Sequence, residues 1–263
     1  MTVPTYTHIL GGQMPGIPQT YLSAVRAQLA VDLNCRSGDF GGDGLFFAEA
    51  ADNPGRRPFP RGDHWLEMAT MGGAAVVSAS PSVLPRARRL LAGKTRDDAF
   101  AMPFVRGFGL FFLPAQNAAP PLPDGYQRET VERGRIPGLY AFPGFRNALQ
   151  YDVNHPRPDV LALVARHDGG IAGMAAASAD CEKLWQIGID VLPGHRGRGL
   201  GAALVRRLSD EILRRGHVPY YGAAATNIAS LRTALRAGFA PAWTAAFRCE
   251  MEPWRFLSAD GGE

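Results

Sequence analysis

The chain has 263 residues, of which 46% are hydrophobic, 10% aromatic and 20% charged. These values are typical of a globular protein with one large or two modest domains, and they exclude a disordered or fibrous chain. No apolar run approaches the roughly 20 residues of a membrane-spanning helix, and residues 1–16 show no basic flank before an apolar stretch. We therefore expect no membrane segment, no signal peptide and a cytoplasmic location.

The net charge of +4 is concentrated in one stretch of the chain. Residues 191–221 carry six arginines against Asp210 and Glu211, which accounts for the whole excess. A short basic stretch suits a small polyanionic ligand better than a nucleic acid, which needs an extended footprint. The odd number of cysteines, without a CxxC pair or a histidine at ligand spacing, predicts reduced structural thiols and no metal site. These cysteines are Cys35, Cys181 and Cys249.

The first half of the chain predicts a small α/β region. The expected elements are a helix at about 20–33, a buried strand at 74–80, a short helix at 82–91 and an aromatic strand at 107–113. Residues 36–63 are rich in Gly, Pro, Asp and Arg, with an apolar interruption at Leu45–Phe47, and predict a long irregular connection. Because residues 114–125 are rich in proline, we expect a linker there. The predicted domains are residues 1–121 and residues 122–263.

The second half has clearer periodicity. Leu200, Leu204, Leu208 and Ile212 recur at every fourth position, which predicts an amphipathic helix ended by Gly216. A hairpin precedes this helix, and Asn227 is a good N-cap for a second helix. The expected order is strands at 160–166, 171–178 and 185–192, the helix at 200–216, a strand at 218–223, the second helix, and a strand at 242–250.

A glycine-rich turn joins the strand at 185–192 to the amphipathic helix, with the sequence Arg196-Gly197-Arg198-Gly199-Leu200-Gly201. The first N–H groups of a helix have no intrahelical partner, so together with the helix dipole they form an anion site. Glycines would let a diphosphate approach the backbone. The other interpretation is a tight structural turn without a ligand.

Two common phosphate-binding motifs fit this turn poorly. A P-loop is excluded because no Lys-Ser/Thr pair follows the glycines. The spacing of Gly197, Gly199 and Ala202 matches a dinucleotide fingerprint loosely. That fingerprint requires an acidic residue at the end of the next strand, where this chain has only residues 220–223 without a carboxylate.

The full string from Ile187 to Gly201, including Val191-Leu192-Pro193, resembles motif A of the GNAT superfamily of N-acetyltransferases. Asn227 with Ser230, followed by Gly238-Phe239, resembles motif B of the same family. The resemblance covers about residues 124–252. It implies a mixed, mostly antiparallel α/β (α+β) sheet flanked by helices, here preceded by a smaller N-terminal α/β domain. Residues 174–180, 185–191 and 218–222 look like the zwittermicin-resistance branch.

The resemblance further implies an acetyl-CoA site. In the family the glycine-rich loop holds the diphosphate, the strand before it pairs with the pantetheine, and a backbone N–H near Asp190 or Val191 polarises the thioester carbonyl. The fourth and fifth family strands splay apart to admit the cofactor. The residues expected to bind acetyl-CoA are Ile189, Val191, Leu192, Arg196, Gly197, Arg198, Gly199, Leu200, Gly201, Ala202, Asn227 and Ser230.

The expected acid and base depart from the family pattern. Many relatives have a carboxylate where this chain has Gln186, and a thiolate-protonating tyrosine where it has Ala234. We take Asp190, Tyr221 and Ser230 as the catalytic candidates. Asp180, Glu182 and Tyr220 are further substitutes, and each has a structural interpretation as well. Catalysis by positioning and a water relay, without a dedicated base, stays open.

The predicted function is transfer of an acetyl group to a primary amine of a small molecule, by direct attack in a ternary complex. The alternative is a degenerate GNAT domain that binds acetyl-CoA or another acyl-CoA as a sensor or scaffold. We expect no nucleic-acid or membrane partner, and an oligomeric state of monomer or homodimer. The N-terminal region is expected to shape the acceptor site.

Overall fold

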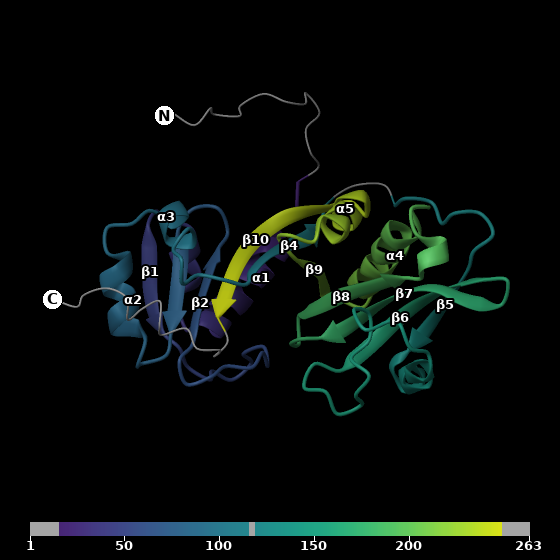
Figure 1. The fold of residues 1–263 in the computed structure, drawn as a ribbon, viewed down its shortest axis with the longest axis horizontal. Helices are drawn as coiled ribbons and strands as arrows, with labels where there is room; N and C mark the ends of the chain where they lie inside the picture. Colours follow the sequence, from purple (N-terminus) through teal and green to yellow (C-terminus); the bar gives the residue numbers. More distant parts are fainter. Residues whose placement is uncertain (1–15, 116–118, 249–263) are drawn as a thin grey trace, which may run out of the picture.

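A computed structural model describes residues 16–115 and 119–248, in which ten strands form one sheet (Figure 1). The strand order is β1-β3-β2-β10-β4-β9-β8-β7-β6-β5. The strands are β1 (Leu45–Glu49), β2 (Leu66–Thr70), β3 (Ala75–Ala79), β4 (Phe108–Pro114), β5 (Gln127–Glu132), β6 (Asp159–His167), β7 (Gly170–Ala179), β8 (Leu184–Val191), β9 (Val218–Ala224) and β10 (Phe239–Arg248). The helices are α1 (Gln19–Leu33), α2 (Leu84–Leu91), α3 (Arg96–Phe100), α4 (Leu200–Arg214) and α5 (Ile228–Arg236), with three short 3-10 segments, η1 (Ser37–Phe40), η2 (Arg133–Ala141) and η3 (Pro193–His195).

The sheet is mixed and mostly antiparallel, which confirms the predicted fold class. Only β1 with β3 and β8 with β9 pair in parallel within the described residues. Parallel neighbours need a long crossover, and α4 supplies it between β8 and β9.

Strands from the two halves of the sequence alternate at the centre of the sheet (Figure 1). The last strand, β10, lies between β2 and β4, and β4 lies between β10 and β9. The N-terminal region is therefore joined to the rest of the molecule by backbone pairing. The predicted domain boundary near residue 121 falls in the connection from β4 to β5.

Three strands were not predicted from the sequence. The Leu45–Phe47 interruption is the start of β1, so the expectation of an irregular connection is wrong at this point. Strand β1 has only partly buried and exposed residues, and Glu67 interrupts the apolar residues of β2. Strand β5 lies at the edge of the sheet and has one buried residue, Val131. Strands β1 and β5 have too few buried positions for a clear period-2 pattern, and the buried positions of β2 do not alternate.

The expected linker at 114–125 begins with the last residue of β4, Pro114. Its residues 116–118 lie outside the described residues. After them, the carbonyl oxygen of Pro120 accepts a hydrogen bond from Arg207 Nη1 at 2.6 Å, so this segment lies against α4. Residues 1–15 and Cys249 also lie outside the described part, and Cys35 and Cys181 are free thiols. No helix among the described residues is long and apolar enough to cross a bilayer.

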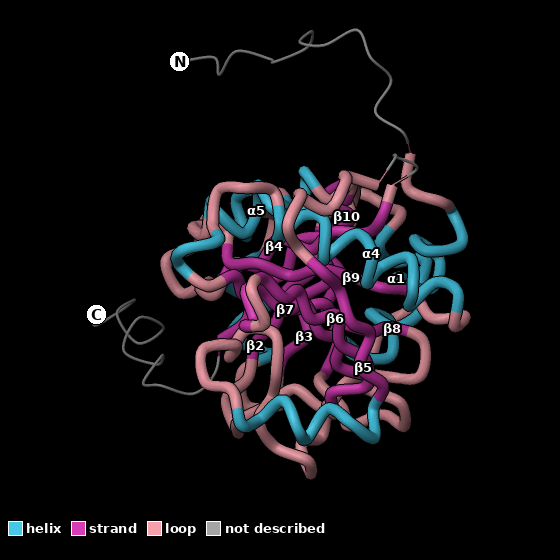
Figure 2. The backbone as a smooth tube through the Cα atoms, turned by 90° about the vertical axis from the view of Figure 1, so that its right-hand side faces the viewer, coloured by secondary structure: helices cyan, strands magenta, loops and turns pink. Residues whose placement is uncertain are grey.

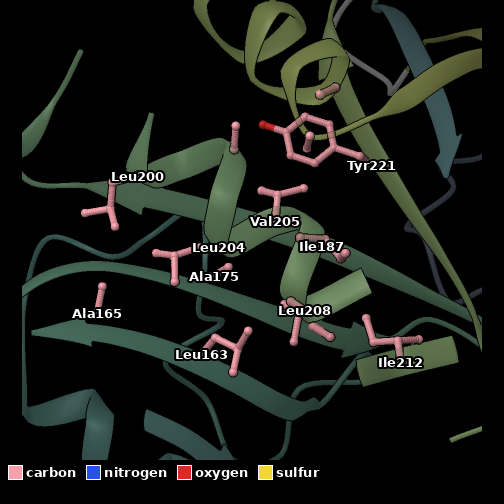
Figure 3. Close-up of a cluster of buried hydrophobic side chains, with 14 of the residues drawn as sticks. Leu163, Ala165, Ala175, Ile187, Leu200, Leu204, Val205, Leu208, Ile212 and Tyr221 are labelled. Carbon is pink, nitrogen blue, oxygen red and sulfur yellow. The ribbon is translucent and has the colours of Figure 1, made fainter. Parts of the chain in front are cut away.

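Helices cover both faces of the sheet (Figure 2). On one face, the leucine stripe of α4 packs on Leu163, Ile187 and Tyr221 (Figure 3). On the other face, α1 packs with Leu184 and Tyr220. Because successive strand residues point to opposite faces, Tyr220 and Tyr221 belong to different cores. Both tyrosines are almost completely buried.

A buried ion pair ties α1 to the segment before β2. Arg57 Nε donates to Asp32 Oδ2 at 2.6 Å, and the Arg57 backbone N–H donates to Asp32 Oδ1 at 2.8 Å. Both side chains are 6% exposed. Burial alone would lower the pKa of Arg57, but Asp32, Tyr220 and Asp180 together outweigh it and raise the pKa, so Arg57 stays charged.

Replacing Asp32 by alanine should destabilise the protein by about 3–5 kcal/mol, because it leaves a buried guanidinium without its carboxylate. Urea unfolding measures the change. The matched control is Asp52→Ala, since Asp52 also pairs with an arginine, Arg56, but is 85% exposed. That variant should lose less than about 1 kcal/mol. Equal losses in the two variants would contradict the importance assigned to the buried pair.

Candidate active site

The parallel strands β8 and β9 separate to form a fork. They pair from Leu184 with Val218 to Ile187 with Tyr221, and no pairing between them continues in the described residues. Beyond that point β8 stays bonded to β7 up to Val191, and β9 stays bonded to β4 up to Ala224. The backbone edges that face one another across the fork are therefore open to a ligand, as the GNAT resemblance implies.

A cavity of about 830 Å³ occupies the fork. Most of the predicted cofactor residues line it, whereas Leu192 and Arg198 do not. The predicted residues that line it are Ile189, Val191, Arg196, Gly197, Gly199, Leu200, Gly201, Ala202, Asn227 and Ser230, together with the catalytic candidates Asp190 and Tyr221.

The glycine-rich loop forms one end of this cavity, which we call the cofactor end. Gly197 and Gly199 have φ of +77° and +83°, a left-handed conformation that favours glycine. The first hydrogen bond within α4 runs from Ala203 N–H to the Gly199 carbonyl. The N–H groups of residues 200–202 come before it and therefore have no partner within the helix. Gly201 faces Val191 and Thr233. Open backbone, a helix N-terminus and small residues together fit the diphosphate of an acyl-CoA.

The register of β8 decides which backbone groups face the fork. Leu192 N–H donates to the Ala172 carbonyl on the β7 side, and the residues two and four positions earlier in β8 share this direction. Asp190 N–H therefore points to β7, whereas Ile189 and Val191 direct their N–H groups into the fork. Of the two N–H groups proposed to polarise the thioester carbonyl, that of Val191 is in position. The Val191 carbonyl accepts from Arg196 Nε at 2.8 Å.

Tyr221 and Ser230 meet at the base of the fork. The Tyr221 hydroxyl lies 2.6 Å from Ser230 Oγ, and both residues line the cavity. Burial raises the pKa of Tyr221, which keeps the phenol protonated at neutral pH. Asn227 accepts from the Ser230 N–H at 3.1 Å, so the predicted N-cap is confirmed and fixes Ser230 at the start of α5. Ala234, at the family's tyrosine position, is completely buried.

Asp190 holds a neighbouring segment in place. Its carboxylate accepts from Asn147 N–H at 2.7 Å, Asn147 Nδ2 at 2.6 Å and Ala148 N–H at 3.1 Å. A side chain at Gly188 would overlap the carbonyl oxygen of Asn147, so glycine permits this close approach. With three N–H groups on its oxygens, Asp190 is placed to position residues 145–149 rather than to accept a proton.

The other proposed substitutes for the acid and base form a buried network. The Tyr220 hydroxyl donates to Asp180, which also accepts from Ser178 Oγ at 2.8 Å. Burial and then Asp180 raise the pKa of Tyr220 well above its usual value. Asp180 is only 2% exposed, while Glu182 is exposed and lies outside the cavity lining. None of the three presents an open carboxylate or phenolate to the cavity.

Of the arginines that line the cavity, only Arg196 was expected from the sequence. On α4, Arg206 pairs with Asp210 and Arg214 with Glu211, and the C-cap residue Arg215 pairs with Glu211 and Glu132. The described residues that line the cavity instead include five arginines and one carboxylate, Asp190. For the other four, the only local signal is the four-residue spacing of Arg232 and Arg236 along α5. The five are Arg146, Arg157, Arg196, Arg232 and Arg236.

Comparisons with known proteins identify similar acetyltransferases. Residues 128–239 match the model of the acetyltransferase (GNAT) family. A GCN5-related N-acetyltransferase-like protein from Streptococcus suis is 17% identical, with a TM-score of 0.42 over 67% of this chain and 72% of its own. A putative GNAT-family acetyltransferase from Novosphingobium aromaticivorans is 19% identical, with a TM-score of 0.40 over 88% and 96%. A putative acetyltransferase from Salmonella typhimurium, solved with its cofactor acetyl-CoA, is 19% identical, with a TM-score of 0.36 over 49% and 96%. No curated protein matches the sequence.

The matched residues contain the fork, the glycine-rich loop and α5. The family model therefore matches the part of the chain that carries the candidate site, which supports an acyltransferase of the GNAT type. The acyltransferase class and the acetyl-CoA cosubstrate predicted from the sequence are confirmed. Among the described residues, no group of three or more His, Cys, Asp or Glu side chains is placed to hold a metal ion.

Proposed function

We propose that the protein transfers an acetyl group from acetyl-CoA to a primary amine of a small molecule, by direct attack in a ternary complex. The observation that carries this proposal is the single cavity through the fork between β8 and β9. It joins the glycine-rich loop at one end to the Tyr221–Ser230 pair at the base of the fork.

Acetyl-CoA, when bound, supplies the acetyl group as a thioester. The amides at the start of α4 bind the diphosphate, and the arginines of α5 offset its charge. The open edge of β8 pairs with the pantetheine, and Val191 N–H donates to the thioester carbonyl oxygen as negative charge develops on it. The amine nitrogen forms a bond to the carbonyl carbon while the carbon–sulfur bond breaks.

The Tyr221 hydroxyl, which Ser230 Oγ holds in place, donates a proton to the leaving sulfur and then regains one from water. The proton lost by the amine passes to water, since the Asp180 and Asp190 carboxylates already accept several hydrogen bonds. Orientation of the two substrates within the fork provides much of the acceleration.

Several finer expectations stay predictions. These are the resemblance to the zwittermicin-resistance branch, a cytoplasmic location, the monomeric or dimeric state, and the division at residue 121 into two domains. We also propose that the N-terminal region shapes the acceptor site. This is supported by Phe59, whose ring lies 4.7 Å from the guanidinium carbon of Arg157, a residue that lines the cavity.

Thiol release from acetyl-CoA in the presence of a panel of amines tests the proposal. Amine-dependent release, with acetylated amine as the product, is expected for at least one member of the panel. Tight acetyl-CoA binding without release by any amine would contradict the transferase and support an acyl-CoA sensor instead.

A further inference from the structure

The cavity has a second end, on the face of β8 opposite to α4. We call it the acceptor end, and it is lined by Arg146, Gln150, Arg157, Ser178 and Gln186. Gln186 pairs with Tyr220 in the register of the sheet and shares its face, whereas Ile187 and Tyr221 face α4. A substrate that approaches the fork from this face meets these side chains before it reaches the base of the fork.

Arg157 is held rigidly at this end. Its guanidinium lies over the ring of Phe59, and Nη1 donates to Gln186 Oε1 at 3.0 Å and lies 3.4 Å from Asp180 Oδ1. The N–H groups on Nε and Nη2 donate to no residue in the described part of the chain. Neither nitrogen is among the buried polar atoms that lack a hydrogen-bond partner, so both are exposed. One edge of the guanidinium is thus fixed by the protein, and the other is open to the cavity.

Gln186 presents a second donor. Its Oε1 accepts from Arg157, and the Tyr220 hydroxyl lies 3.3 Å from the same oxygen. This leaves the Nε2 amide group to donate, and a Cβ atom at Gly222 in the fork would be 3.3 Å from it. The position that carries a carboxylate in many relatives therefore offers hydrogen-bond donors here.

The carboxylates near the acceptor end are already occupied. Asp180 accepts from Tyr220 and Ser178 and is buried, while Asp190 accepts three N–H groups from residues 147–148. An amine carrying only positive charge would lie beside Arg157 and Arg146 without an open carboxylate. An anionic group on the same molecule would remove this conflict, since it would accept from Arg157 and Gln186.

From this arrangement we infer that the acceptor is an amine that also bears a carboxylate, which Arg157 binds with its open edge while Gln186 donates beside it. This inference rests on the proposed acetyltransferase function and names its substrate class. It separates the protein from enzymes that act on polycationic amines.

The experiment compares matched amines with the full chain and acetyl-CoA. Each pair is a free amino acid and its carboxamide, which differ in the negative charge, and a polyamine is added. kcat/KM is obtained from thiol release. For the pair that the wild type uses best, kcat/KM should be about 10- to 100-fold higher for the amino acid than for its carboxamide. A hydrogen bond to a charged group contributes about that much to binding. Arg157→Gln should bring this ratio close to one, and Arg157→Lys should retain part of it.

Arg128→Gln is the control variant, since Arg128 is exposed on β5 and lies outside the cavity lining. It should keep the wild-type ratio. Wild-type preference for the carboxamide or the polyamine, or an unchanged ratio in Arg157→Gln, would overturn the inference. Acetyl-CoA titration of each variant verifies that the fold is intact. Absence of release with every amine would instead overturn the proposed function, and the substrate class with it.

Discussion

Gly199→Asp should weaken acetyl-CoA binding by about 100-fold or more. Gly199 precedes the first residue of α4 and has φ of +83°, so a side chain there is strained. The new carboxylate would also lie at the helix N-terminus, where it competes with the diphosphate for the same N–H groups and repels it. Calorimetric titration with acetyl-CoA measures the loss.

Gly216→Asp is the matched control for this variant. Gly216 follows the other end of α4, has φ of +82° and has open space around it, as Gly199 does. It lies outside the cavity lining. The same residue change therefore introduces similar backbone strain without a charge at the cofactor end. Similar loss of acetyl-CoA affinity in both variants would mean that strain, not the anion site, determines binding.

Tyr221→Phe should lower kcat by about 100-fold while the KM for acetyl-CoA changes little, because loss of a general acid typically costs two to four orders of magnitude. The substitution keeps the ring, which packs in the core between β9 and α4, and removes only the hydroxyl beside Ser230. Because burial raises the pKa of Tyr221, the wild-type rate should lose this proton donor only at a higher pH than a free tyrosine would. Steady-state thiol release over a range of pH measures both quantities.

Further variants test whether a loss of kcat in Tyr221→Phe reflects the loss of the general acid. Ser230→Ala should lower kcat as well, and the double variant should lose less than the product of the two single effects, since the hydroxyls act as a pair. Tyr140→Phe removes a hydroxyl that donates to Asp159 at 2.9 Å, outside the cavity lining, and should leave kcat unchanged. A Tyr221→Phe enzyme with at least half of the wild-type kcat would exclude Tyr221 as the acid.

The parts of the fold that were predicted from the sequence are those with a strong local signal. The four-residue spacing of leucines and the glycines at its ends define α4, and Asn227 defines the start of α5. Strands β1, β2 and β5 are short and lack a clear alternation, and they become strands by pairing with β3, β10 and β6. The insertion of β4 between β9 and β10 has no sequence signal, because it depends on pairing between distant segments.

The same distinction holds for the active site. The glycine-rich loop acts through its backbone, so its residues and their spacing were visible in the sequence. Side chains from distant segments were not. The role of Asp190 depends on a segment 43 residues earlier in the chain, and Arg157 reaches the cavity through contacts with Phe59 and Gln186. These contacts arise only when the two regions pack together.

Calorimetric titration of the wild-type protein with acetyl-CoA tests the central claim most directly, because the cofactor end, the fork and the proposed chemistry all depend on this ligand. We expect one molecule of acetyl-CoA bound per chain, with saturation well below millimolar concentration. Absence of binding at millimolar acetyl-CoA would contradict the account and would leave the glycine-rich loop as a structural turn.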